Sequence, residues 1–136
     1  KRGDLLVCEG GYPGRAAIWN WEDEGYKFQK ALHRVRFYNN IVAKFYLYFL
    51  DFLCSSKKIE EYLTGSGIQH LTGISLKKLP IPFPSSDEQH RIVQKLNELL
   101  QTCDALEASI KASAAQNDKL LQQVLREALR KEVVAV

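Results

Sequence analysis

The chain has 136 residues, of which 46% are hydrophobic and 26% are charged, and its formal net charge is +3 at pH 7. Such a composition is typical of a single globular domain with an extension. The apolar stretch 41–53 contains Lys44 and Asp51 and is shorter than the roughly 18 residues of a membrane span, so it predicts a core helix and excludes a transmembrane one.

The charges are distributed unevenly along the chain. Residues 1–86 contain twelve Lys or Arg and eight Asp or Glu, whereas residues 87–136 contain seven and eight. A basic first part joined to a near-neutral second part points to an anionic partner such as nucleic acid. A solvated basic surface without a partner is the alternative.

Two short apolar runs, 5–8 and 16–21, predict the first strands of the fold. The seven residues between them, 9–15, include three Gly and one Pro. This composition is typical of a loop, because Gly adopts positive φ without strain and Pro does not extend a strand. A loop of this kind between two strands is also a common position for binding residues.

Residues 29–38 alternate between two sets of side chains with a period of two. The alternation predicts a third strand, whose outer face is basic and carries Arg34 and Arg36. These arginines are candidates for binding an anion. Pairing with the acidic residues 22–24 is the alternative.

The next segments are mainly helical. Asn40 is placed to cap a helix over 41–55 that is apolar almost all round and therefore central. A shorter amphipathic helix is predicted over 57–63, and one or two helical turns over 75–79. Residues 80–84, with three alternating prolines, are forced into an extended conformation. The first part of the chain is therefore a mixed α+β head.

No Pro or Gly follows Pro84, and residues 86–132 predict one uninterrupted helix about 70 Å long at ~1.5 Å per residue. Its start fits a capping box, in which Ser86 accepts from the Gln89 amide and the Gln89 side chain returns to Ser86. The chain is accordingly divided into a head at 1–85, a long helix at 86–132 and a tail at 133–136.

The long helix carries a heptad seam, because its apolar positions recur alternately four and three residues apart. The predicted helix–helix interface comprises Ile92, Leu96, Leu99, Cys103, Leu106, Ile110, Asn117, Leu120 and Val124. Ser113 and Asn117 are polar seam positions, which either fix the register against a partner helix or mark a loose contact. An exposed face of this kind predicts a partner helix.

The residues that most often carry catalysis or metal binding are scattered. The three cysteines (Cys8, Cys54 and Cys103) predict buried thiols in a reducing compartment, and the three histidines (His33, His70 and His90) predict no metal site. Phosphate-binding, dinucleotide-binding and nucleophile-elbow motifs do not occur in the sequence. A hydrolase that uses Cys8 is a remote alternative, so the chain is predicted not to be an enzyme.

Basic and polar residues in the loops and on the basic strand suit nucleic-acid recognition instead. Lys and Arg neutralise phosphates, whereas Gln69 and Arg15 have the geometry to read base edges. Simpler alternatives are surface ion pairs for the arginines and a turn cap for Gln69. The predicted DNA-binding residues are Tyr12, Arg15, Arg34, Arg36, Lys57, Lys58, Gln69, His70, Thr72 and Lys77.

The order of these features resembles a known family. It begins with Gly-Asp-Leu-Leu-Val at 3–7, followed by a glycine-rich turn, a basic strand and Gly-x-Gly-Ile-Gln-x-Leu-Thr at 65–72. The proline segment 79–84 and the helix-opening Glu-Gln-His-Arg-Ile-Val at 88–93 are the most specific part. Over residues 3–110, the sequence is similar to the DNA-specificity subunit of type I restriction–modification enzymes.

This resemblance implies a cytoplasmic, non-catalytic subunit with two recognition domains, each reading one half of a split DNA target. Long helices separate the two domains, pack as an antiparallel coiled coil and dock the methyltransferase subunits. Through these subunits, the protein meets the restriction subunits. S-adenosylmethionine, ATP and Mg²⁺ are expected on the partner subunits, and no cofactor is expected on this chain.

The chain is too short for the whole family pattern and matches about half of one recognition domain with one helix. We therefore expect a DNA-recognition fragment that reads one half-site and forms an antiparallel homodimer through the long helix. The alternative is an adaptor whose coiled coil assembles a protein complex without contacting nucleic acid. Steep weakening of duplex binding by salt would separate the two.

Overall fold

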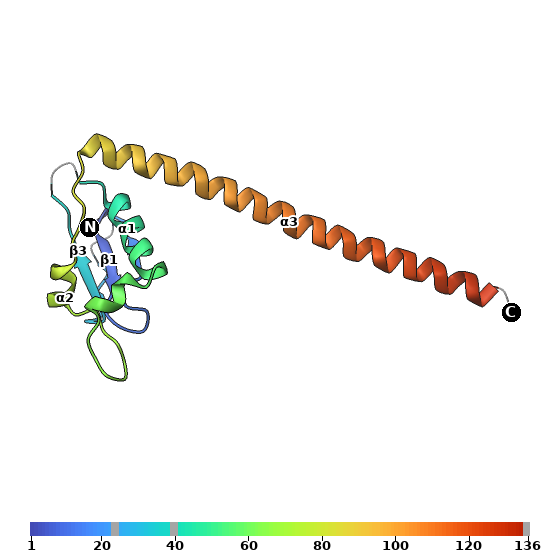
Figure 1. The fold of residues 1–136 in the computed structure, drawn as a ribbon, viewed down its shortest axis with the longest axis horizontal. Coiled ribbons are helices and arrows are strands. Elements are labelled where there is room, and N and C mark those ends of the chain that lie inside the picture. The colour runs from blue at the N-terminus through green and yellow to red at the C-terminus, as the bar shows by residue number, and fades with distance from the viewer. Residues whose placement is uncertain (23–24, 39–40, 135–136) are drawn as a thin grey trace. The chain divides into compact units, whose positions relative to one another are not determined.

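The computed structural model describes residues 1–22, 25–38 and 41–134. The chain forms two compact units, Lys1–Gln94 and Lys95–Val136. The first unit combines a small sheet with helices and also contains the first two turns of the long C-terminal helix α3, Ser86–Val134. The second unit is the remainder of this helix. The predicted α+β class with a long C-terminal helix is confirmed (Figure 1).

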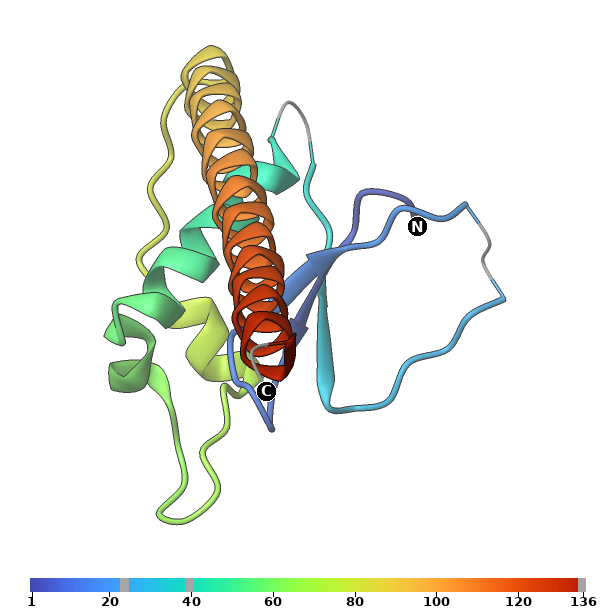
Figure 2. The same ribbon diagram turned by 90° about the vertical axis from the view of Figure 1, so that its right-hand side faces the viewer.

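The sheet has three antiparallel strands in the order β2-β1-β3. The central strand β1, Leu5–Cys8, pairs with β2, Ala16–Ile18, on one side and with β3, Leu32–Val35, on the other. The short helices of the first unit, at residues 43–55 and 73–78, lie on one side of the sheet (Figure 2). Within β1, Leu5 and Val7 alternate onto the helical side, where they are buried.

The third strand is shorter than the predicted 29–38. Leu32 donates its amide hydrogen to the Gln29 carbonyl at 3.1 Å, so the chain makes a turn where the prediction began a strand. Pairing with β1 starts only after this turn, at Leu32, and the assigned strand ends at Val35. The period-two pattern therefore identified the strand but overestimated its length.

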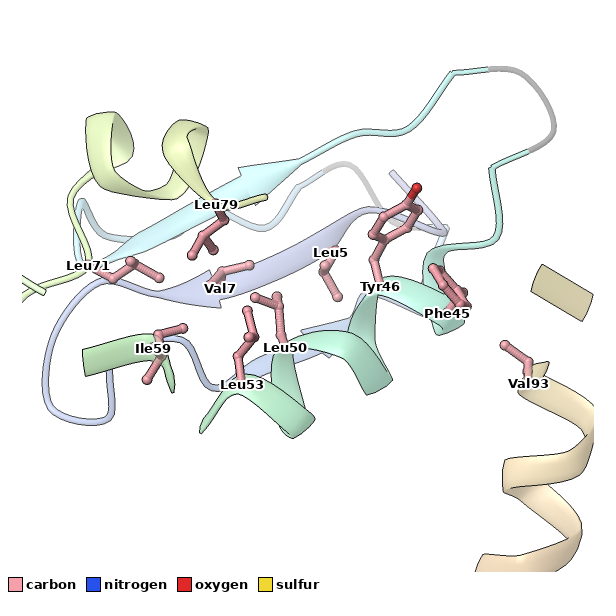
Figure 3. Packing of buried hydrophobic residues seen from close by; sticks show 10 residues of the cluster. All are labelled: Leu5, Val7, Phe45, Tyr46, Leu50, Leu53, Ile59, Leu71, Leu79 and Val93. Atoms are coloured by element: carbon pink, nitrogen blue, oxygen red, sulfur yellow. The ribbon is translucent and has the colours of Figure 1, made fainter. Parts of the chain in front are cut away.

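The core lies between the sheet and helix α1, Ala43–Ser55 (Figure 3). In α1, Phe45, Tyr46, Leu50 and Leu53 are buried, which confirms that this helix is central. The helix begins two residues later than predicted, with Val42 as its N-cap and no side-chain cap. Asn40, the predicted cap, lies outside the described residues.

Two short helical segments complete the head. The predicted helix 57–63 is a 3₁₀-helix, η1, Lys58–Tyr62, which starts after Lys57 adopts a left-handed conformation with φ of 60°. The predicted turns at 75–79 are α2, Gly73–Lys78. Leu71 and Leu79, which flank α2, are both buried in the core cluster and attach this helix to the sheet.

Helix α3 begins at the predicted residue, but its cap differs from the predicted one. The Gln89 backbone amide donates to the Ser85 carbonyl at 2.9 Å, and the Ser85 hydroxyl accepts from the Glu88 amide at 3.3 Å. The Gln89 side chain bonds to Val42 and Pro84 rather than returning to Ser86. The predicted capping box is therefore wrong, because the Gln89 side chain has partners in the tertiary structure.

The first turns of α3 also take part in the head's apolar packing. Val93 belongs to the core cluster, and Ile92 packs against that cluster. Ile92, the first predicted position of the heptad seam, thus contacts the head core. Across the described residues, α3 and the other helices lack any stretch long and apolar enough to cross a membrane.

Candidate nucleic-acid interface

Two loops that are far apart in the sequence meet at one end of the sheet (Figure 1). Residues 9–15 connect β1 to β2, and residues 64–72 connect η1 to α2. The Leu71 amide donates to the Glu9 carbonyl at 2.8 Å, which ties the second loop to the first. His33 of β3 donates from Nε2 to the Leu71 carbonyl at 2.7 Å. We call loops 9–15 and 64–72, with the turn 56–58, the loop end.

The turn 56–58 joins the loop end because Gly14 allows a close approach. Gly14 has φ of +88°, and a Cβ at this position would lie 2.6 Å from Ile59 Cδ1 and 2.9 Å from Cys54 Sγ. Both the backbone conformation and the space therefore require glycine. Loop 9–15 consequently packs directly on the end of α1 and the start of η1, where Lys57 and Lys58 are located.

Loop 64–72 is a closed loop that presents polar side chains. Thr64 and His70 exchange backbone hydrogen bonds of 2.9 and 2.8 Å. Gly65 has φ of +111°, and a Cβ there would clash with the Ile68 carbonyl oxygen. Gln69 and His70 are exposed on this loop. Its backbone is thus held by its own hydrogen bonds, which leaves the Gln69 side chain in solvent.

Loop 9–15 presents an aromatic ring beside a guanidinium group. Tyr12 is 73% exposed, and the Arg15 guanidinium carbon lies 5.9 Å from the centre of its ring. Desolvation raises the pKa of Asp51 on α1, and the nearby Arg15 charge partly opposes this shift. A solvent-exposed pair of this type can contact a phosphate and a base or sugar together.

The two lysines at the loop end are exposed. Lys58 Nζ lies 5.2 Å from the centre of the Phe52 ring, which holds this ammonium group against α1. Lys57 occupies the left-handed position that ends α1. Together with Arg15, these lysines add positive charge to the end that carries Tyr12 and Gln69.

Two further predicted residues belong to α2. Thr72 is half-buried and caps this helix, since its Oγ1 accepts from the Ser75 amide at 3.2 Å. Lys77 lies in the last turn of α2, is exposed and lines a groove of about 560 Å³ beside β3. Thr72 therefore has a structural role. Lys77 lies on a different part of the surface from the loop end.

Of the two β3-segment arginines, only Arg36 has a clear structural role. Its Nε and Nη2 donate to the two carboxylate oxygens of Asp4 at 2.7 and 2.6 Å, and Asp4 is 3% exposed. Hydrogen bonding to Arg36 holds the pKa of Asp4 well below its usual range, despite the burial that opposes this shift. Arg36 thus pairs with Asp4, and Glu22 pairs with Arg2 at 3.1 Å.

Arg34 is exposed and lines a hollow of about 400 Å³ with Trp19, Tyr26 and Lys27. The Trp19 ring centre lies 4.9 Å from that of Trp21 and 5.3 Å from that of Tyr26. The residues predicted from the sequence to bind DNA do not include this aromatic cluster. The signal was present, because 19–28 contains four aromatic residues together with Lys27.

The cysteines differ from the prediction of three buried thiols. Cys8 and Cys54 are half-buried, whereas Cys103 is exposed on α3. Desolvation raises the pKa of the Cys54 thiol, and the Asp51 charge raises it further. In the part of the chain that the structure describes, no three His, Cys, Asp or Glu residues are grouped as metal ligands would be.

The second unit has an exposed apolar surface along its helix. Leu96 is half-buried, but the large apolar residues from Leu99 to Leu129 are about half exposed or more, which is unusual for leucine and isoleucine in a globular protein. Helical geometry is confirmed for the whole predicted seam, but pairing with another helix remains a prediction. The exposed residues are Leu99, Leu100, Leu106, Ile110, Leu120, Leu121, Val124, Leu125 and Leu129.

Comparison with known proteins identifies relatives of the chain. The model of the type I restriction modification DNA specificity domain matches residues 1–116. The EcoBI specificity subunit of Escherichia coli, a type I restriction enzyme subunit, is 29% identical over 99% of this chain and 28% of its own length. The EcoAI specificity subunit of Escherichia coli is 32% identical over 69% of this chain and 16% of its own length.

The chain therefore spans between about a seventh and somewhat over a quarter of the curated relatives that it matches. No solved structure matches the chain.

Proposed function

Because the chain belongs to the family of type I restriction–modification DNA specificity domains, we propose that it recognises a duplex DNA sequence without itself catalysing a reaction. The loop end supports this proposal. Its two loops are held together by a hydrogen bond, and they present the Gln69 amide and the Arg15 guanidinium at one end of the sheet. Recognition residues on loops that are fixed by a rigid scaffold are common in binding proteins.

Each part of the loop end has a distinct task in this proposal. Arg15, Lys57 and Lys58 neutralise phosphates and hold the protein in register on the duplex. Gln69 reads a base edge through its paired donor and acceptor, most favourably at adenine. Tyr12 packs its exposed ring on a sugar or base beside the Arg15 contact. Direct contacts of Thr72 and Arg36 with DNA are less favoured, because both groups are used within the head.

The second unit supports the rest of the proposed assembly. Its exposed apolar residues favour pairing with a second helix, which would be the helix of another copy in an antiparallel homodimer. Two heads on one dimer would read the two halves of a bipartite target. In the complete enzyme, the helix pair would dock methyltransferase subunits, and S-adenosylmethionine, ATP and Mg²⁺ would bind to the partner subunits.

Selection from a pool of random duplexes, followed by binding measurements at several salt concentrations, tests DNA recognition. We expect an enriched sequence whose association constant falls steeply with salt, because cations on DNA are released when Lys and Arg contact phosphates. Replacing Gln69 with Ala should cost about 1–3 kcal/mol on the selected sequence and relax specificity at one position. Gln101→Ala, on the exposed face of α3, is the matched control.

A pool that shows no enrichment, and no duplex binding at low salt, would refute recognition by this chain. The exposed apolar helix favours a coiled-coil adaptor as the second candidate function. In that case, the helix should still self-associate or bind a protein, and the loop-end substitutions should not change that association.

A further inference from the structure

A buried glutamine links three segments of the head. Gln89 is 2% exposed, and its Oε1 accepts from the Val42 amide at 3.0 Å. Its Nε2 donates to the Pro84 carbonyl, also at 3.0 Å. Val42 is the N-cap of α1, Pro84 ends the proline segment and Gln89 lies in the first turns of α3. One side chain thus connects the starts of the two largest helices with the segment that leads into α3.

Both partners of Gln89 come from places where regular secondary structure supplies few bonds. The N-terminus of α1 has no side-chain cap, and backbone amides at a helix start have no partner within the helix. The segment 80–84 contains three prolines, which donate no amide hydrogen, so it has a reduced capacity for backbone pairing. The side-chain amide of Gln89 therefore supplies hydrogen bonds to the Val42 amide and the Pro84 carbonyl that their own segments do not supply.

The glutamine is accompanied by apolar contacts on the same helix face. Ile92 and Val93 follow it by three and four residues, and this spacing places side chains on one side of a helix. Val93 is buried in the core cluster with Phe45, and Ile92 packs against that cluster. In the described residues, every buried side-chain nitrogen and oxygen has a hydrogen-bond partner. A fully satisfied polar network within an apolar contact favours one arrangement over alternatives.

We propose that Gln89 is a positioning residue that fixes the first turns of α3 on the head and thereby limits which half-site spacings a paired molecule accepts. This inference rests on the proposed function for its effect on DNA. Its structural part stands on the two hydrogen bonds and the burial of Gln89. Because α3 continues without a break from Ser86 to Val134, loosening its first turns would loosen the start of the paired helix.

Amide hydrogen exchange at Val42 tests the structural part without DNA. Gln89→Met keeps the side-chain length but removes both the acceptor and the donor. We expect exchange at Val42 to become about tenfold faster or more in this variant, because the amide loses its bond, and to remain unchanged in Gln101→Met on the same helix. Unchanged exchange at Val42 in a folded Gln89→Met protein would overturn the proposal.

Gln89→Glu serves as a second variant, because it keeps the acceptor for Val42 and removes the donor to Pro84. Protection of the Val42 amide should then persist while the second bond is lost. If Gln89→Met does not fold, the Glu variant carries the test. Loss of Val42 protection in a folded Gln89→Glu protein would overturn the assignment of Oε1 as the partner of this amide.

The effect on DNA is tested with duplexes that carry two copies of a half-site selected by the unaltered chain. The spacer between the copies is changed in steps of one base pair. We expect the unaltered chain to prefer one spacing by about tenfold, a difference of about 1.4 kcal/mol. In Gln89→Met, this preference should shrink to about twofold, with the affinity for a single half-site unchanged.

An unchanged spacing preference in Gln89→Met would overturn the DNA part of the proposal, even though the chain still binds DNA. If the unaltered chain selects no duplex, the proposed function fails, and the DNA part of this inference fails with it. The Val42 exchange experiment tells the two failures apart, because it tests the Gln89 hydrogen bonds in the absence of DNA.

Discussion

The first unit, which is the head with the first turns of α3 (residues 1–94), and the helix of residues 95–134 bury the same residue types to different extents. In the head, Leu5 and Leu71 are at most 1% exposed, whereas Leu106 and Leu120 on the helix are about 60% exposed. The head buries its leucines among residues of the same chain. The helix of residues 95–134 carries apolar residues along one side, and no described side chain of its own unit covers them, so we expect a partner helix to do so.

The largest expected effect comes from a cavity in the head. Leu5→Ala should lower the free energy of unfolding by about 3 kcal/mol, because it removes a fully buried side chain from the sheet side of the core. Leu106→Ala removes the same atoms from an exposed position and should leave the unfolding of the head unchanged. Urea denaturation followed by tryptophan fluorescence measures both. Equal effects would contradict the contrast between the two regions.

The buried ion pair of the head gives the next largest effect. Asp4→Asn should destabilise the head by about 2 kcal/mol, because Arg36 loses its carboxylate partner and Asn accepts only part of the bidentate contact. Asp104→Asn, an exposed change on α3, is the control.

The same ion pair predicts how the stability of the head depends on pH. The pKa of Asp4 is lowered in the folded state, so its stabilisation is present above the unfolded value of about 3.9 and is lost as the pH falls below that value. Denaturation curves between neutral pH and pH 3 should show the onset of this loss in the unaltered protein and a smaller change in Asp4→Asn. Equal losses in the two proteins would remove Asp4 as the cause.

Helix pairing is expected to depend on exposed seam positions. Leu106→Lys should raise the dissociation constant of the dimer about tenfold, which corresponds to about 1.4 kcal/mol, because it places an ammonium group in an apolar contact. Gln101→Lys introduces the same charge away from the seam and should have little effect. Sedimentation equilibrium measures the association. A monomeric unaltered chain at high protein concentration would refute the homodimer.

The smallest expected effect on stability concerns the loop end. Lys58→Ala should change the free energy of unfolding by less than about 0.5 kcal/mol, since the side chain is exposed. It should nevertheless reduce the salt dependence of DNA binding by about one counterion, if its ammonium contacts a phosphate. Fluorescence anisotropy titrations at several salt concentrations measure this slope. An unchanged slope would remove Lys58 from the interface.

Sequence patterns predicted the elements whose causes are local. A run without Pro or Gly and with regular apolar spacing predicted α3 to within two residues of its end. The apolar run 5–8 and the glycine-rich loop after it predicted β1 and its connection. The predicted third strand was too long, because the turn that bonds Leu32 to Gln29 carries no Gly or Pro that would have revealed it.

The candidate site was predictable in composition but not in arrangement. Tyr12 and Gln69 lie 57 positions apart in the sequence, and tertiary contacts such as the bond between Leu71 and Glu9 show that their loops share one end of the sheet. The period-two pattern placed Arg34 and Arg36 on the same face of the strand. In the structure, Arg36 pairs with the buried Asp4 carboxylate, whereas Arg34 lines an aromatic hollow. Periodicity assigns a side chain to a face, but it does not identify the neighbour that this side chain meets there.

The amino-acid sequence by itself determined the class of the protein, the long helix and the apolar seam along it, because these follow from backbone preferences and from spacing along one chain segment. The tertiary structure decided which polar groups pair. Arg36 meets Asp4 across 32 positions, and Gln89 meets Val42 across 47 in place of the expected cap. Such pairs depend on how distant segments pack, and the desolvation of buried polar groups then selects the arrangement in which each has a partner.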